Sequence, residues 1–322
     1  MANTMSKEIK KSRPNIADSS VKAYVANLEK LKKLSDSDDL MKIVKSLDKV
    51  KELLVDKTSN TQRNYFNAII IWLMAVDGDK DLIKEYGDIR DELNKKYEDE
   101  QASGKISDKQ KENFVEMEEL TKMVADMDKE IKSKKLKKKE ELTAKERALV
   151  QVFVLFSLYT RLPLRNDVSE MGAITKREYN KLSDKEKKEH NYLVVNKADM
   201  FMVLNKYKTA KKYEENKIDI SKDLEKILRM WIRMEGMGIL FKSSTGKALS
   251  RNAISQLMIK TTKKYLGKSI STTMIRKIYL SSKYADVKEE MEKDAKVMGH
   301  DVSTQQKVYV KKGQEDSDSQ DS

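Results

Sequence analysis

Turn-forming residues are scarce in this 322-residue chain, which contains only 10 glycines and 2 prolines. Because Gly and Pro supply the tight turns between short strands, their scarcity argues against an all-β sandwich and favours a mostly helical chain. The length suggests two domains, since single hydrophobic cores stop growing at roughly 250–300 residues. Hydrophobic residues make up 39% of the chain, which is enough for packed cores and argues against wholesale disorder.

The composition also limits the chemistry. The chain has no cysteine and only two histidines, His190 and His300, which excludes disulfides, thiolate chemistry and a His-rich metal centre. No apolar run approaches the roughly 20 residues of a membrane span, and no signal peptide is evident, so we expect an intracellular protein. A net charge of +13 indicates a polyanion partner such as nucleic acid, although a merely lysine-rich protein would have the same charge.

Helical periodicity dominates the first part of the chain. Residues 1–17 are expected to be flexible, and residues 18–131 to form a helical domain. Its first helix is expected to have Ser19 as N-cap, and the others to lie near 40–54, 59–74, 80–98 and 107–131. The third helix presents polar side chains that suit contacts to phosphates and base edges, or form an ordinary solvated helix end. They are Asn60, Thr61, Arg63 and Asn64.

Six of the eight residues from Lys132 to Lys139 are lysines. Such a run is typical of a solvated linker, and linkers between DNA-binding domains also lie along phosphates. We therefore expect a lysine-rich linker over residues 132–142. The lysines expected to contact DNA are Lys134, Lys135, Lys137 and Lys138.

The second half of the chain has a different pattern. A strongly apolar helix is expected over residues 143–160, and Pro163 ends it just before Arg165. Short strands are expected at 192–195, 200–204 and 217–220, and helices after Ser221 and near 250–265, 272–283 and 286–298. The pattern predicts a mainly α fold with a small antiparallel β-sheet. The second domain is expected to cover 143–312, before a disordered acidic tail over 313–322.

Four blocks with chemically useful side chains occur in order in this half. Arg165 follows the apolar helix, Lys208 lies between two strands, and Arg276 lies on a helix. His300 then precedes Tyr309 by nine residues. Taken singly, any of these cations is equally well explained as surface charge.

In this order and spacing, the blocks resemble the tyrosine recombinase (phage integrase) family. The resemblance is closest to the branch from large eukaryotic viruses and related mobile elements. Its most specific part is the Met-Gly-His sequence that ends at His300, followed by Thr304 and Tyr309. By motif it covers about residues 143–310, whereas the first 130 residues are similar only as a helical core-binding domain.

The resemblance implies roles for the residues of these blocks. Arg165 and Arg276 would stabilise the negative charge that gathers on a scissile phosphate. Tyr309 would attack the phosphorus and form a 3′-phosphotyrosyl intermediate. Lys208, on a β-hairpin, would protonate the leaving oxygen, and His300 would hydrogen-bond the phosphate. The phosphotyrosyl bond conserves the energy for rejoining, so the resemblance implies no ATP, metal or other cofactor.

The sequence departs from the family pattern at two places. Where the family has His-x-x-Arg, Thr273 occupies the His position before Arg276, and a threonine cannot titrate. The acidic residue after the first arginine is either Asp167 or Glu170, and we prefer Glu170. Two further lysines that follow Lys208 are expected to contact DNA, namely Lys211 and Lys212.

Three functions remain open at this point. The first is a site-specific recombinase that acts as a homo-tetramer on double-stranded DNA, through a four-way junction. The second is a type IB topoisomerase, which shares the catalytic set and relaxes supercoils as a monomer. The third is a degenerate protein that binds DNA without cleaving it. In each case we expect the protein wherever its DNA lies: the nucleus or a viral factory in a eukaryotic host, otherwise the cytoplasm.

Overall fold

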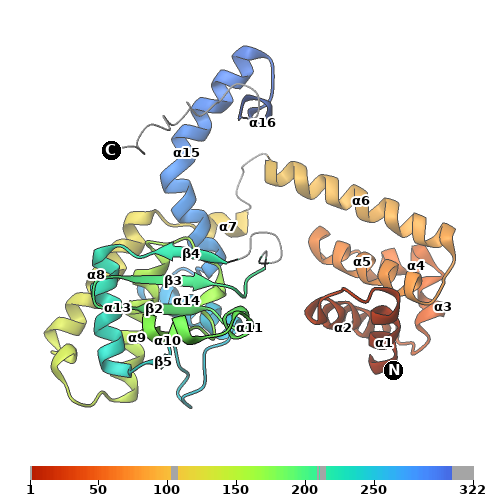
Figure 1. The fold of residues 1–322 in the computed structure, drawn as a ribbon. Coiled ribbons are helices and arrows are strands. Elements are labelled where there is room, and N and C mark those ends of the chain that lie inside the picture. Colours follow the sequence, from red (N-terminus) through yellow and green to blue (C-terminus); the bar gives the residue numbers. More distant parts are fainter. Residues whose placement is uncertain (1, 103–107, 209, 211–214, 307–322) are drawn as a thin grey trace, which may run out of the picture. The chain divides into compact units, whose positions relative to one another are not determined.

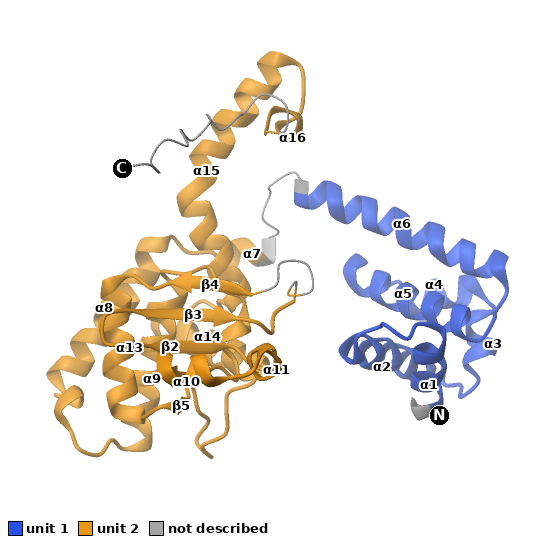
Figure 2. Cartoon of the chain, viewed as in Figure 1, with its two compact units in different colours: residues 1–107 blue, residues 108–322 orange. Residues whose placement is uncertain are grey.

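The chain divides into two units, residues 1–107 and residues 108–322, as Figure 2 shows. The structure is a computed structural model and describes residues 2–102, 108–208, 210 and 215–306. Among the described residues, no helix combines the length and apolar character needed to cross a membrane.

Unit 1 is built from helices alone in its described part, as expected. The helices are α1 (Ala2–Ser12), α2 (Asp18–Ser35), α3 (Leu40–Val44), α4 (Leu47–Leu54), α5 (Ser59–Ala75) and α6 (Lys80–Ala102). Helix α5 lies at the centre, in contact with α1, α2 and α6 (Figure 1). Its residues Phe66, Ile69 and Leu73 are almost completely buried. The spacing of three and four residues explains why one face of α5 forms the core of the unit.

Three details of unit 1 differ from the sequence-based expectation. Residues 2–12, expected to be flexible, form α1, because Met5 and Ile9 are one turn apart and both are buried. Helix α2 begins at Asp18, so Ser19 is not its N-cap. The stretch over residues 40–54 is two helices rather than one, with a break at Lys45 and Ser46.

Unit 2 combines helices with one small sheet. Its helices are α7 (Asp108–Asn113), α8 (Met117–Ser133), η1 (Leu136–Lys138), α9 (Ala144–Tyr159), η2 (Asn166–Val168), α10 (Lys176–Lys181), α11 (Asp184–Glu189), α13 (Lys222–Glu235), α14 (Arg251–Leu266), α15 (Thr272–Met298) and α16 (Val302–Thr304). Its strands are β1 (Gly172–Thr175), β2 (Tyr192–Val195), β3 (Met200–Leu204), β4 (Asn216–Asp219) and β5 (Gly238–Ile239). The mainly α class with a small sheet is therefore confirmed.

The sheet has the strand order β4-β3-β2-β1-β5. Strands β1 and β2 pair in parallel and the other neighbours pair antiparallel, so the sheet is mixed rather than wholly antiparallel. All five residues of β3 are buried. Met202 packs into the main core with α9 and α13, whereas Phe201 and Val203 pack into a smaller cluster on the other face. Burial on both faces explains why β3 has a continuous apolar sequence.

The lysine-rich segment is folded into unit 2. Helix α8, which precedes it, packs on α9, and Leu136 at the centre of the segment is fully buried. Three of its lysines form ion pairs with acidic residues of α8: Lys132 with Asp128 at 2.5 Å, Lys134 with Glu130 at 2.6 Å and Lys137 with Asp128 at 2.9 Å. The structure therefore differs from the predicted linker over 132–142, and the division between the units lies earlier, at residues 107 and 108.

Helix α15 is longer than expected. The sequence analysis predicted two helices, over 272–283 and 286–298, but the structure has one continuous helix over Thr272–Met298. No Gly or Pro interrupts this stretch, which leaves the helix without a residue that would end it. Gly299 ends the helix in a left-handed conformation with φ of 71°.

Candidate active site

Arg165 lies in a short loop whose backbone is held by a buried tyrosine. Helix α9 ends at Tyr159, and Pro163 then prevents a further turn before Arg165, which precedes η2. The Tyr159 hydroxyl donates to the carbonyl oxygen of Arg165 at 3.2 Å. It also contacts the Asn166 side-chain oxygen at 3.0 Å. Burial raises the pKa of Tyr159, so the hydroxyl keeps its proton and remains a donor.

Asn166 connects this loop to two later helices. Its side-chain amide donates to the carbonyl oxygen of Arg251 and to Ser255 Oγ, both at 2.9 Å. Ser255 Oγ in turn lies 3.3 Å from Thr272 Oγ1, at the start of α15. These contacts join the loop of Arg165 to the first turn of α15, the helix that carries Arg276.

Arg165 and Arg276 line one cavity of about 490 Å³. The cavity is also lined by Asp167 and by residues of β3 and β4, including Leu204 and Asn216. Burial lowers the pKa of Arg276, and the neighbouring charge of Arg165 lowers it further. Two guanidiniums at one cavity provide donors that can pair with the oxygens of a phosphate group.

The acidic residue beside the two arginines is Asp167. It is 6% exposed, and its Oδ1 accepts a hydrogen bond from Arg251 at 3.1 Å. Burial raises the pKa of Asp167, whereas the charges of Arg251, Arg165 and Arg276 lower it. Glu170, which the sequence analysis preferred, is exposed, has a φ of 59° and does not line this cavity. Of these two acidic residues, Asp167 is the one that lines the cavity of both arginines.

Lys208 lines a neighbouring cavity of about 310 Å³ rather than the cavity of the arginines. Tyr207 lines both cavities, so the two cavities share this residue as part of their walls. The hairpin segment of Lys208 is attached to the Arg165 loop through Asn191. The Asn191 amide donates to Asp167 O at 2.7 Å and to Lys206 O at 3.1 Å. Its side-chain oxygen accepts from the backbone N–H groups of Asn205 and Lys206.

His300 and Thr273 lie at opposite ends of α15. Thr273 is exposed in the first turn, and its Oγ1 accepts a hydrogen bond from Arg276 at 3.4 Å. His300 follows the last turn, and its Nδ1 lies 3.1 Å from Asp301 O. A helical rise of 1.5 Å per residue separates Arg276 from Met298 by about 33 Å. The structure therefore does not bring His300 to the arginines of its own chain.

Three of the predicted site residues lie outside the described part of the chain. They are Lys211, Lys212 and Tyr309. Their roles stay predictions from the sequence.

The polar residues predicted on α5 form a prearranged set in unit 1. The Arg63 guanidinium lies 4.4 Å from the centre of the Tyr97 ring and donates to Asn60 Oδ1 at 2.7 Å. Thr61 Oγ1 lies 3.0 Å from Thr58 Oγ1, the N-cap of α5. Asn64 is exposed, and its carbonyl oxygen accepts from Asn27. These contacts fix Arg63 near the helix N-terminus, where anions bind favourably.

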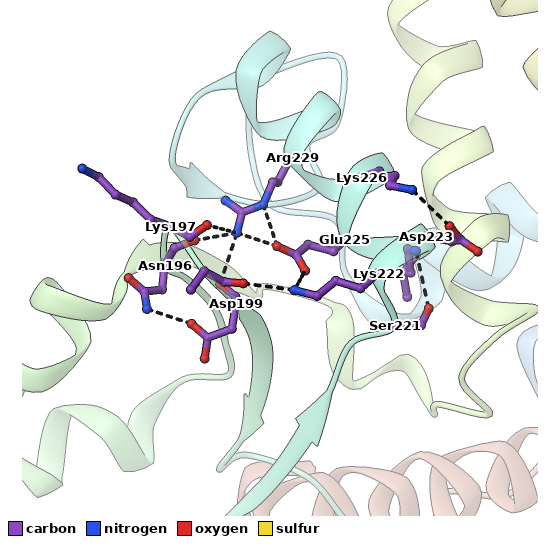
Figure 3. A network of polar contacts seen from close by, with 11 residues as sticks. Asn196, Lys197, Asp199, Ser221, Lys222, Asp223, Glu225, Lys226 and Arg229 are labelled. Carbon is purple, nitrogen blue, oxygen red and sulfur yellow. Dashed lines mark hydrogen bonds and ion pairs between the residues drawn. The ribbon is translucent and has the colours of Figure 1, made fainter.

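A second polar network holds the turn between β2 and β3 to helix α13 (Figure 3). Arg229 donates to Glu225 Oε1 at 2.6 Å and to the carbonyl oxygens of Asn196 and Asp199 in the turn. Lys222 Nζ donates to Glu225 Oε2 at 3.0 Å. These bonds lower the pKa of Glu225. The network lies outside the cavity of the arginines and holds the turn that leads into β3, a strand that lines the cavity.

Sequence reasoning missed several residues that position this site, namely Tyr159, Asn166, Asn191, Arg251 and Ser255. Asn166 and Asp167 stand next to Arg165 in the sequence, which was a usable signal. Asn191 follows His190 in the short connection between the charged helix α11 and the apolar strand β2. Nothing in its local sequence shows that it is 5% exposed and makes four hydrogen bonds.

Comparisons with known proteins give no close relative. No family model and no curated protein matches the sequence. Among solved structures, the chain is similar to the XerH site-specific recombinase bound to its difH substrate in a pre-cleavage complex. The TM-score is 0.46 at 15% identity, over 95% of this chain and 81% of that chain. It is also similar to XerA recombinase, with a TM-score of 0.34 at 10% identity, over 95% of this chain and 92% of that chain.

Proposed function

We propose that this protein is a tyrosine recombinase that cleaves and rejoins double-stranded DNA through a 3′-phosphotyrosyl intermediate. One observation carries the proposal: Arg165 and Arg276, far apart in sequence, line a single cavity together with the buried Asp167. Two guanidiniums at one cavity suit the non-bridging oxygens of a phosphodiester, which gain negative charge during attack at phosphorus. The ordered sequence blocks that end at Tyr309 supply the nucleophile for this reaction.

The proposed step exchanges one ester for another. The phenolic oxygen of Tyr309 forms a bond to phosphorus as the bond from phosphorus to the 5′ oxygen breaks. The phenolic proton leaves to water, because Thr273 stands at the position where the family has a titrating histidine. The 5′ oxygen takes a proton from Lys208 and becomes a free hydroxyl. Attack by a 5′ hydroxyl reverses these transfers and rejoins the strand, so no external energy source is required.

Asp167 has a supporting part in this reaction. Its carboxylate faces Arg165, Arg251 and Arg276, and so offsets the repulsion between the two arginines that bind phosphate. The pairing with Arg251 at 3.1 Å opposes the rise that burial gives to the pKa of Asp167. We therefore propose Asp167, and not Glu170, as the acidic residue of the site.

The finer features of the proposal rest on the sequence blocks. We propose that four copies act on DNA and exchange strands through a four-way junction. The branch from large eukaryotic viruses and mobile elements is proposed on the same basis. Contacts to DNA are proposed for the polar residues of α5 in unit 1, and for Lys135 and Lys138, which are exposed in unit 2.

The test is a covalent trap on DNA. The substrate is a pool of duplexes of randomised sequence, each of which carries a nick. After cleavage, the short fragment with the free 5′ hydroxyl diffuses away, so the strand cannot be rejoined. Wild-type protein is expected to form an adduct that survives denaturation, whereas Tyr309→Phe and Arg276→Ala form none. Tyr284→Phe, at an exposed position on α15, is the control and keeps wild-type adduct formation. If Tyr309→Phe forms as much adduct as wild type, the proposal is wrong.

The same preparation distinguishes the two alternatives. Relaxation of a supercoiled plasmid by a monomeric protein, without junction formation, would identify a topoisomerase. Salt-sensitive DNA binding without any adduct would identify a degenerate DNA-binding protein.

A further inference from the structure

A second basic cavity lies beside the cavity of the arginines. Its volume is about 310 Å³, within the range of small-ligand sites, and Lys206, Lys208 and Arg251 line it. It shares Tyr207 with the cavity of the arginines. Of the described residues that line it, Glu170 is the only acid. The cavity therefore has an excess of positive charge and suits an anionic group.

The cations of this second cavity have donors left for a ligand. In the lysine-rich segment, by contrast, four lysines are each paired with an acid, namely Lys132, Lys134, Lys137 and Lys139. Lys206 and Lys208 are exposed, and neither forms an ion pair within the described part of the chain. Arg251 bonds to Asp167 through Nη2, and its side chain is still 56% exposed. A guanidinium has five N–H donors, so Arg251 can bind a second anion beside this carboxylate.

Polar contacts hold the backbone of two of these cations in place. Asn191, which is 5% exposed and lines the same cavity, donates to the carbonyl oxygen of Lys206 and accepts from its N–H group. The carbonyl oxygen of Arg251 accepts from the Asn166 amide. The wall of the cavity is therefore arranged before any ligand binds, which reduces the entropic cost of binding.

We propose that the second cavity binds a second phosphate of the same DNA strand, the one that follows the nucleoside of the leaving 5′ oxygen. Lys206 and Arg251 bind this phosphate, while Lys208 acts on the leaving oxygen. The site then holds the cleaved 5′-hydroxyl strand until it is rejoined. Binding of a second phosphate stands on the cavity alone, whereas its assignment to the leaving strand rests on the proposed function.

The role proposed for Lys208 determines which neighbouring phosphate is bound. Lys208 protonates the 5′ oxygen in the proposed reaction, so the cavity that it lines lies on the side of the strand that leaves. On that strand, the next anionic group is the phosphate attached to the 3′ oxygen of the leaving nucleoside. Arg251 lines this cavity and bonds to Asp167, which lines the cavity of the arginines. A phosphate bound to Arg251 therefore lies beside the site of the scissile phosphate.

Retention of the cleaved strand has a physical advantage for rejoining. After cleavage, only non-covalent contacts hold the 5′-hydroxyl strand near the phosphotyrosyl bond. A strand that stays bound attacks as if the step were intramolecular, without the entropic cost of a new encounter. Hydrogen bonds from charged donors to one phosphate are strong enough to change its affinity about tenfold or more.

Direct binding of small nucleotides tests the second site without cleavage. The probes are thymidine 5′-monophosphate, which offers one phosphate, and thymidine 3′,5′-bisphosphate, which offers both. Isothermal titration calorimetry at low salt gives the two dissociation constants, and their ratio cancels any effect confined to the cavity of the arginines. We expect the wild-type protein to bind the bisphosphate at least about tenfold more tightly. A ratio near one overturns the proposal.

Substitutions assign this gain in affinity to the second cavity. Lys206→Ala and Arg251→Ala should each lower the ratio to about threefold or less, whereas Arg276→Ala weakens the binding of both probes and keeps the ratio. Arg177→Ala, which removes the same charge at an exposed position on α10, is the matched control and keeps the wild-type ratio. Lys206→Ala leaves the bond between Arg251 and Asp167 intact, so it decides the question if Arg251→Ala fails to fold. A wild-type ratio in Lys206→Ala overturns the proposal.

Rejoining tests the assignment to the leaving strand. A duplex selected from the nicked pool by adduct formation has a known cleavage position. Its isolated adduct is supplied with 5′-hydroxyl strands in which the phosphate after the first nucleoside is either normal or a neutral methylphosphonate. The neutral group should raise the half-saturating strand concentration about tenfold for the wild type and about threefold or less for Lys206→Ala. Equal sensitivity of the two proteins overturns the assignment.

The two assays separate this inference from the proposed function. If the wild type forms an adduct but binds both nucleotides equally well, the second phosphate site is wrong and the proposed function stands. If the wild type forms no adduct, the proposed function fails, and the ratio of nucleotide affinities still decides whether the second cavity binds phosphate.

Discussion

The side-chain amide of Asn191 donates a 2.7 Å hydrogen bond to the carbonyl oxygen of Asp167, which lies 24 residues earlier in the chain. The same side chain bonds to the backbone of Asn205 and Lys206. One buried amide therefore joins the loop of Arg165 to the hairpin of Lys208. It ties together the two backbone segments whose side chains the proposed reaction needs at one phosphate.

Removal of this amide is expected to affect both stability and cleavage. Asn191→Ala loses four hydrogen bonds at a buried position and should lower the free energy of unfolding by about 2–4 kcal/mol. Urea denaturation measures the change, and the adduct assay measures the slower cleavage. Asn205→Ala is the control, because its amide reaches His190 O at a longer 3.3 Å at a less buried site. Equal effects of the two variants would contradict the role given to Asn191.

The acidic position is tested by a pair of isosteric substitutions. Asp167→Asn removes the charge beside Arg165, Arg251 and Arg276, so the two phosphate-binding arginines repel each other without compensation. We expect the rate of adduct formation to fall at least about tenfold, which corresponds to about 1.4 kcal/mol in the barrier. Glu170→Gln, at the exposed position, should leave the rate unchanged. If Glu170→Gln slows adduct formation and Asp167→Asn does not, Glu170 is the acidic residue of the site.

The proposed role of Lys208 as the proton donor is tested by a change in the leaving group of the substrate. If it protonates the 5′ oxygen, Lys208→Ala should slow cleavage by about 10²-fold or more. A substrate with sulfur at the 5′ bridging position needs no proton to leave, so the variant should cleave it at nearly the wild-type rate. Lys206→Ala, two residues away on the same hairpin, is the matched control and should respond equally to both substrates. No rescue by sulfur would argue against Lys208 as the acid.

DNA binding by unit 1 is tested through its salt dependence. Affinity for duplex DNA should fall steeply with salt, and Arg63→Ala should reduce the slope of log affinity against log salt by about 0.9 if it removes one phosphate contact. Tyr97→Ala removes the ring below Arg63 but keeps its charge. It should weaken binding with the slope unchanged. Fluorescence anisotropy between low and moderate salt measures both, and a flat salt dependence of the wild type would exclude the DNA-binding role.

The network of Glu225 predicts a pH dependence of stability. Its hydrogen bonds with Arg229 and Lys222 lower the pKa of Glu225 below 4.5, the usual value of a glutamate side chain. The stabilisation is therefore fully present above pH 4.5 and is lost as the pH falls through the lowered folded-state pKa. Glu225→Gln should lower the melting temperature at pH 7 and reduce the loss of stability on acidification. Asp223→Asn, an exposed acid on the same helix, should preserve the wild-type pH profile.

Local sequence patterns predicted much of the fold. Helix α9, strands β2 and β3 and the N-cap Ser221 of α13 lie where the pattern indicated them. Periodicity records which side chains face a core, and for these elements it was unambiguous. It was ambiguous for α15, because the sequence holds no residue that ends a helix at the expected break near residue 284.

The candidate site was predictable in its residue types but not in its arrangement. By itself, the sequence determined a mainly helical chain and an ordered series of basic blocks ending at Tyr309. Only the tertiary structure decided that Asp167 rather than Glu170 faces Arg276, that Asn191 ties the hairpin to the loop, and that Leu136 packs in a core. The physical reason is that apolar periodicity reports burial, whereas the partner of a buried polar group depends on which distant segment folds against it.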